Sequence, residues 1–205
     1  MRLGAHVSTV GGLSTAFGRA TEIGAETMQI FVSSPLAWKF SMPSSDQVEA
    51  FRTEAKASDI SPFFIHGSYL VNVGGDTNLV TKSVESLTLN LTAASALGAA
   101  GVIFHGGSHK GRGFDAVLNQ SANALSEALE GSPEDVWLII ENSAGMGAQI
   151  GASFEEIGRL VEAIDSDRVK VCLDTQHCFA AGYDIADQEG MISAMTEFDH
   201  HIGLE

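Results

Sequence analysis

Four residues of metal-ligand type recur along the chain at nearly even intervals: His66, His105, Glu141 and Asp174. They lie 39, 36 and 33 residues apart, and each ends a short apolar run. Imidazole and carboxylate groups are ligands that zinc and similar borderline cations take in proteins. His177, expected just inside the loop that follows Asp174, adds another potential ligand. Hydrolytic metal clusters commonly share one carboxylate between ions, and Glu141 fits that bridging role.

The apolar runs predict the strands that position these residues. The runs are Arg2–Val7, Thr27–Phe31, Pro62–His66, Gly101–His105, Trp137–Glu141 and Lys170–Asp174. They are apolar throughout, as in strands that are covered on both faces. Between them, apolar stripes at helical spacing include residues 84–94, 114–129 and 157–164, and Ser153 and Glu156 have the spacing of a capping box. Strands alternating with helices predict a parallel sheet.

The position of the ligand-type residues favours one parallel architecture over another. In a TIM barrel, side chains at the C-terminal ends of successive strands converge on one mouth, where catalytic groups lie. A doubly wound sheet binds its ligand at a switch point instead. Six β/α units fit in 205 residues, whereas eight would need about 270. We therefore expect a single α/β domain over residues 1–205, a TIM (β/α)8-type barrel that is incomplete, with about six units present.

The motifs around these residues resemble those of the endonuclease IV (deoxyribonuclease IV) family, the second family of apurinic/apyrimidinic endonucleases. The matching segments run in order over essentially the whole chain: Gly4–Ser8, His66–Asn72, Phe104–His109, Ile140–Gly145 and Leu173–Asp184. The last segment is close to diagnostic alone. The resemblance implies a hydrolase with a trinuclear zinc site. Such an enzyme cleaves DNA 5′ to an abasic residue by metal-activated water, in base excision repair.

The resemblance also implies a role for each ligand. His66, His105 and Glu141 serve the first zinc, and Glu141 is the catalytic carboxylate that bridges to the second. Asp174 belongs to the second zinc and His177 to the third. The family's remaining ligands, on the seventh and eighth strands, have no counterpart in these residues. We therefore expect fewer than three zinc ions in this chain.

The resemblance further implies that the partner is double-stranded DNA with abasic sites. Tyr69 and Trp38 match aromatic positions in two loops that contact DNA at the barrel mouth, where the damaged nucleotide is flipped out. The net charge of −15 argues against binding through a broad basic field. Bound divalent cations reverse the local sign of a cleft, so the acidity weakens the nucleic-acid interpretation without excluding it.

Composition sets the remaining expectations. Hydrophobic types make up 44% of the chain, yet the sequence contains no run of 18 apolar residues, so no membrane span is expected. The start, Met1–His6, lacks the apolar region of a signal peptide. Two cysteines, Cys172 and Cys178, make neither a disulfide framework nor a CxxC motif. We expect a cytoplasmic monomer with reduced thiols.

Two other functions remain open at this stage. A metal-dependent sugar isomerase or epimerase on a similar barrel also collects Glu, Asp and His at its strand ends, and Tyr69 and Trp38 would then line a sugar pocket. It should bring a catalytic Lys or a second acid to the mouth, and the long match at Leu173–Asp184 argues against it. The other alternative is an inactive fragment of the endonuclease that keeps the scaffold and half of the site.

Overall fold

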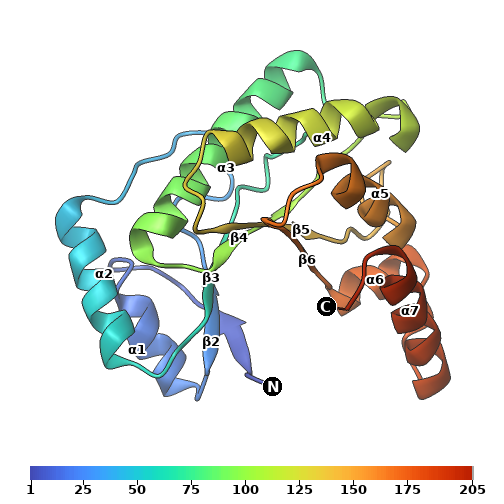
Figure 1. Ribbon diagram of the computed structural model, residues 1–205. Helices are drawn as coiled ribbons and strands as arrows, with labels where there is room; N and C mark the ends of the chain where they lie inside the picture. Colours follow the sequence, from blue (N-terminus) through green and yellow to red (C-terminus); the bar gives the residue numbers. More distant parts are fainter. Residues whose placement is uncertain (205) are drawn as a thin grey trace.

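The computed structural model describes residues 1–204 and contains one six-stranded sheet (Figure 1). All neighbouring strands are parallel and follow the order of the sequence. The strands are β1 (Gly4–His6), β2 (Thr27–Ile30), β3 (Phe63–His66), β4 (Gly101–His105), β5 (Trp137–Glu141) and β6 (Val169–Cys172). Each of the first five predicted apolar runs contains one strand, and the sixth overlaps β6, so the alternation predicted from the sequence is confirmed. The sixth run is displaced, because β6 begins one residue before Lys170 and stops two residues before Asp174.

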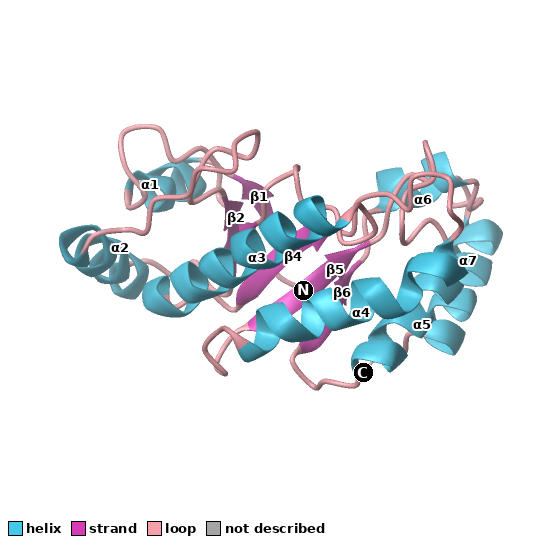
Figure 2. Ribbon diagram, turned by 90° about the horizontal axis from the view of Figure 1, so that it is seen from above, coloured by secondary structure: helices cyan, strands magenta, loops and turns pink. Residues whose placement is uncertain are grey.

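The first five helices fill the connections between strands and lie along the outside of the curved sheet (Figure 2). The helices are α1 (Thr15–Glu22), α2 (Ser45–Ala57), α3 (Thr77–Leu97), α4 (Phe114–Glu130), α5 (Phe154–Ile164), α6 (Thr175–Ala181) and α7 (Gln188–His201). Two helices, α6 and α7, follow the last strand. The predicted TIM-type β/α topology is therefore present.

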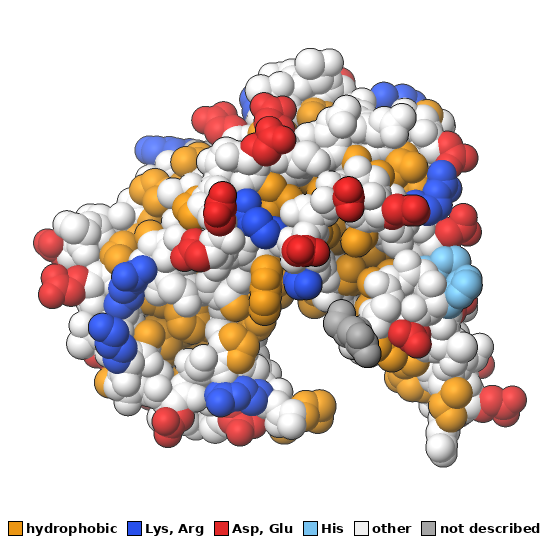
Figure 3. Space-filling model, viewed as in Figure 1, with side chains coloured by type: hydrophobic (Ala, Val, Ile, Leu, Met, Phe, Trp, Pro, Cys, Tyr) orange, Lys and Arg blue, Asp and Glu red, His pale blue; other side chains and the backbone are white. Residues whose placement is uncertain are grey.

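The sheet does not close into a barrel within residues 1–204. In this part of the chain β1 pairs with β2 and β6 pairs with β5, and no strand joins the two edges. The space-filling view shows a hollow between the N-terminal part of the molecule and the C-terminal helices (Figure 3). The expected incomplete barrel is confirmed as an open six-stranded sheet.

The strands alternate between a face that packs under the helices and a face that lines the inside of the curve. Ile65, Val102 and Phe104 belong to the large core cluster and are buried against the helices. Ile103 and Ile139 point the other way and are buried outside that cluster. Residues on both faces are apolar, which is why the strands read as continuous apolar runs.

Local capping fixes where α2 and α5 begin. Ser44 and Gln47 form a reciprocal capping box at α2. At α5 the Ser153 side chain accepts a hydrogen bond from the Glu156 amide, as the sequence predicts. The Glu156 carboxylate, however, accepts from the amides of Gly151 and Ala152 rather than from Ser153. The loop before α5 is thereby tied to the first turn of the helix.

A second, smaller core holds the C-terminal helices. Its buried members are Phe154 from α5, Cys178 from α6, and Ala194 and Phe198 from α7. The Phe154 and Phe198 rings meet edge-on with centroids 5.2 Å apart. This core positions α6, which carries part of the site described below. In residues 1–204, no helix combines the length and the apolar character needed to cross a membrane.

Candidate metal centre

Five predicted ligand residues come together at the C-terminal end of the sheet. Potential ligand atoms of His66, His105 and Glu141 lie within 4.8 Å of one another. Those of Glu141, Asp174 and His177 do the same. Glu141 is thus common to two three-residue groups, which come from β3, β4, β5 and the segment after β6. Parallel pairing explains the convergence, because all these strands end on the same side.

The Glu141 carboxylate lies between the two groups. Its Oε2 atom is 3.5 Å from His66 Nε2 and 3.9 Å from His105 Nε2. Its Oε1 atom is 3.3 Å from His177 Nδ1. Glu141 and His105 are direct neighbours in the β4–β5 register, which places their side chains together. With 7% of its surface exposed, Glu141 is a buried carboxylate surrounded by three imidazoles.

Backbone carbonyls orient two of the imidazole rings. The Nδ1 atom of His66 lies 2.8 Å from the carbonyl oxygen of Gly67. Because a carbonyl only accepts, Nδ1 donates to it, and Nε2 is the nitrogen that faces Glu141. His177 Nδ1, the nitrogen that also faces Glu141 Oε1, lies 2.9 Å from the carbonyl oxygen of Asn142. It donates to that carbonyl, which leaves Nε2 as the His177 nitrogen that can bind a cation. Such outer hydrogen bonds fix the tautomer and the orientation of metal-ligating histidines.

Burial is the main cause of a lowered pKa at His105. Burial lowers the pKa of His105, and the nearby His66 and His177 act in the same direction, while the negative charges of Glu141 and Asp174 oppose them. A metal ligand must be deprotonated, so a neutral imidazole at this position favours cation binding.

The structure corrects the predicted placement of Asp174 and His177. Asp174 does not end the strand but is the N-cap of α6, and its Oδ1 accepts a hydrogen bond from the His177 amide at 2.8 Å. His177 lies inside α6 rather than in a loop. The helical turn brings the two side chains to one side, with His177 Nδ1 3.6 Å from Asp174 Oδ2. They therefore join Glu141 in one group, although the family resemblance assigns them to different ions.

The two aromatic residues predicted to contact DNA differ in their surroundings. Tyr69 lies beside the ligand cluster with 51% of its surface exposed. Its ring centroid is 5.2 Å from that of His66 and 6.0 Å from that of His105. The Phe31 ring packs edge-on against the Tyr69 ring, with the centroids 5.5 Å apart. Trp38 is half-buried in the loop after β2. Of the two, it is Tyr69 whose ring lies against those of His66 and His105.

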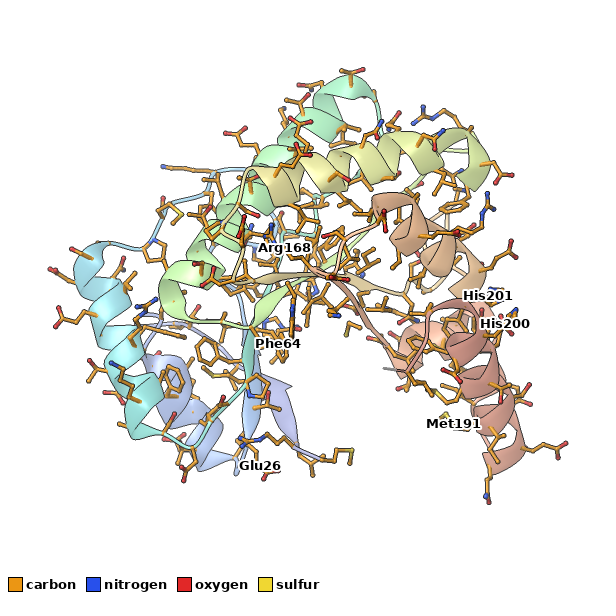
Figure 4. All side chains as sticks on the ribbon, in the orientation of Figure 1. Glu26, Phe64, Arg168, Met191, His200 and His201 are labelled. Carbon is orange, nitrogen blue, oxygen red and sulfur yellow. The ribbon has the colours of Figure 1, made fainter. Side chains whose placement is uncertain are left out.

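Other histidines lie outside the two ligand groups. His6 contacts Gln29 through Nδ1 and its ring centroid is 6.1 Å from that of His66; burial lowers its pKa. His109 accepts a hydrogen bond from the Gly113 amide and so stabilises its own loop. His200 and His201 lie at the end of α7, on the outer side of the molecule (Figure 4).

One residue of this region escaped the sequence analysis. Asn142 follows Glu141 directly and is 3% exposed, and its carbonyl and side chain both contact the segment that carries Asp174 and His177. The only signal in the sequence was its place inside the Ile140–Gly145 motif. Its partners in that segment lie 32 to 36 residues away, so local periodicity could not have identified them.

Comparison with known protein families gives a consistent result. The family model described as a xylose isomerase-like TIM barrel matches residues 17–204. A protein of Halothermothrix orenii named probable endonuclease 4 is 37% identical over 207 residues, which cover 100% of this chain and 74% of that protein. One of the same name from Halobacterium salinarum is 39% identical with the same coverage.

Two solved structures illustrate the similarity of the fold. The crystal structure of endonuclease IV from Thermus thermophilus superimposes with a TM-score of 0.88 at 38% identity, covering 100% of this chain and 73% of that one. A D-tagatose 3-epimerase-like protein reaches a TM-score of 0.71 at 17% identity, covering 95% of this chain and 72% of that one. At that identity the likeness to the epimerase-like protein concerns the fold alone.

Proposed function

This chain belongs to the endonuclease IV family within the xylose isomerase-like TIM barrels, and we propose that it is a zinc-dependent apurinic/apyrimidinic endonuclease. In this proposal it hydrolyses the DNA phosphodiester 5′ to an abasic residue, as a step of base excision repair. The observation that carries the proposal is the placement of Glu141. One of its oxygens faces His66 and His105, and the other faces His177.

The donor set fits zinc-type ions. His66, His105 and Glu141 offer two imidazoles and a carboxylate, which are three protein ligands that leave a fourth, open position. Glu141, Asp174 and His177 offer an imidazole and two carboxylates for a second ion. Ions bound there would supply an activated water and charge stabilisation for the leaving oxygen of a phosphodiester.

The protein's own groups prepare the site for this chemistry. The buried Glu141 provides negative charge between the imidazoles, which favours cations at both groups. The carbonyl of Gly67 holds the His66 ring in the orientation that faces Glu141. No side-chain nucleophile is required for hydrolysis by water. The role of Glu141 is therefore to hold and orient rather than to attack.

Tyr69 supports DNA as the partner. Its ring is half-exposed beside His66 and His105, at the rim of the ligand cluster. An exposed aromatic ring next to the reacting phosphate is suited to stacking against a base or wedging into the stack. In the proposal it contacts nucleotides flanking the lesion, while the abasic sugar approaches the metal centre.

The distribution of charge is compatible with a DNA substrate despite the net charge of −15. On the face shown in Figure 3, Asp and Glu side chains are scattered over the outer helices rather than gathered in one patch. Lys39 and Lys110 are exposed in the loops that follow β2 and β4, on the side of the sheet that carries the ligands. These two lysines and the bound metal ions would together offset the repulsion between the acidic protein and the DNA phosphates there.

A nicking assay under enzyme excess tests the proposal. With added Zn²⁺, the chain should nick a duplex carrying one abasic analogue on the 5′ side of the lesion, leaving a 3′-hydroxyl, and should leave the intact duplex uncut. The matched control is Glu141→Gln, which keeps the size of the side chain and removes its charge. Nicking no faster than this control, or equal cutting of both duplexes, would refute the proposal. Epimerisation of a ketose by the same preparation would favour the sugar-enzyme alternative.

A further inference from the structure

Asn142 makes an unusual set of contacts across the site. Its Oδ1 accepts a hydrogen bond from the Asp174 amide at 2.6 Å. Its Nδ2 donates to the Asp174 carbonyl at 3.0 Å and to the Sγ atom of Cys178 at 3.2 Å. Its own carbonyl oxygen lies 2.9 Å from His177 Nδ1. The residue is 3% exposed, so water does not substitute for these partners.

The chemistry of these partners fixes the orientation of the amide. The Asp174 N–H can only donate, so it must face the oxygen of Asn142 and not the nitrogen. The amide nitrogen then faces the Asp174 carbonyl and the Cys178 sulfur, both of which accept. The side chain therefore binds both backbone groups of a single residue, as a neighbouring strand would. It extends the β5–β6 pairing past the end of β6 at Cys172.

These bonds determine how the next turn of the chain begins. Asp174 is the N-cap of α6, and its Oδ1 accepts from the His177 amide. The Asp174 carbonyl in turn accepts from the Cys178 amide at 3.0 Å. Holding the Asp174 backbone thus sets both the direction of its carboxylate and the first turn of α6, which carries His177. The Asn142 carbonyl acts on the His177 ring directly.

We infer that Asn142 is a positioning residue that aligns Asp174 and His177 with Glu141. The inference rests on the proposed metal centre and adds to it a device that couples its two halves. Glu141 and Asn142 are consecutive, so the end of β5 supplies both the shared carboxylate and the amide that holds the Asp174 backbone. This set of Asn142 hydrogen bonds is called the clamp on the second group. The first group, His66, His105 and Glu141, does not depend on this clamp, because its histidines come from β3 and β4.

Metal titration separates the two groups. Co²⁺, whose absorption spectrum reports each coordination environment, should bind the parent chain in one tight and one weaker step. In Asn142→Ala the tight step should be unchanged, and the weaker step should lose affinity by roughly 10–100-fold, the usual effect of removing an outer hydrogen bond to a metal ligand. A second variant, Asn142→Ser, keeps a hydroxyl too short to reach both backbone groups and should show the same pattern if the alanine variant does not fold.

The control is Asn90→Ala. Asn90 is equally buried and donates to the Ser86 carbonyl within α3, outside the site. Its loss removes a buried amide and its hydrogen bond outside the site, and should leave both binding steps intact. Amide exchange in the metal-free chain gives a second readout, since the Asp174 amide should lose protection in both Asn142 variants and keep it in the control.

Each failure has a distinct meaning. An unchanged weaker step in the Asn142 variants would overturn the positioning role while leaving the metal centre standing. Equal weakening of both steps, or weakening by Asn90→Ala as well, would show a merely structural contribution. If the parent chain binds no Co²⁺, the metal centre itself is wrong and the role of Asn142 falls with it.

Discussion

Replacing Phe198 with alanine should loosen the C-terminal helices while leaving the sheet folded. Phe198 is 7% exposed and belongs to the small core of Phe154, Cys178 and Ala194, separate from the large cluster under α1–α5. Its ring meets Phe154 edge-on at 5.2 Å. Because this core is what attaches α7 and the inner side of α6, losing the ring removes much of their docking surface.

The size of the effect follows from burial. A buried phenylalanine replaced by alanine costs roughly 3–5 kcal/mol. Taking the lower end, the equilibrium for opening the two helices should rise roughly a hundredfold, since about 1.4 kcal/mol corresponds to a factor of ten. Amide exchange by mass spectrometry should show this increase in α7 and α6, with exchange in α3 and α4 unchanged. Because α6 carries His177, the second metal-binding step should weaken as well.

A matched substitution in the large core distinguishes local from global loosening. Phe51 is fully buried, and its ring centroid lies 4.8 Å from that of Phe17. Phe51→Ala should lower the global unfolding midpoint instead of opening α7 selectively. The reasoning is refuted if exchange in α7 is unchanged by Phe198→Ala. It is equally refuted if that variant exposes α3 and α4 as much as α7, because the helices would then not form a separate unit.

Three further predictions concern the Tyr183 hydroxyl, the Tyr69 ring and the zinc content of the chain. The Tyr183 hydroxyl accepts from the Phe154 amide and donates to Glu197, both at 3.0 Å, so Tyr183→Phe should cost roughly 1–2 kcal/mol in urea unfolding. Burial raises the pKa of Tyr183 to about 12 from its ordinary value of 10, so the unfolded chain loses this proton at lower pH than the folded chain. The contribution of Tyr183 to the free energy of unfolding is therefore present below pH 10 and lost between pH 10 and 12. The Tyr183→Phe variant should not show this loss of stability between pH 10 and 12. Tyr69→Ala should weaken binding to abasic duplex by roughly 1–3 kcal/mol, the usual value of one stacked base, with zinc content unchanged; an equal loss of zinc would show that Tyr69 supports the fold instead. The 205-residue chain should retain about one tightly held zinc after dialysis and nick abasic DNA slowly, since three protein ligands suffice for one ion; three retained zinc ions with fast nicking would contradict this.

The sequence by itself determined the repeating architecture and singled out the candidate ligand residues. Apolar runs and helical stripes are local patterns, so they predicted the strands and helices and their parallel order. The same runs placed His66, His105 and Glu141 at strand ends, and a parallel sheet carries all such ends on one side. The start of α5 at Ser153 was likewise readable, because a cap depends on residues only a few positions apart.

Only the tertiary structure decided how the second half of the site is built. The sequence placed His177 in a loop, whereas Asp174 caps a helix that contains it. That turn depends on Asn142, which is 32 residues from Asp174, and on the packing of Phe154 against Phe198. Contacts between residues so far apart in the chain leave no periodic pattern in either segment. The opposite directions of the two Glu141 oxygens arise in the same way, because they depend on where β3, β4 and α6 meet.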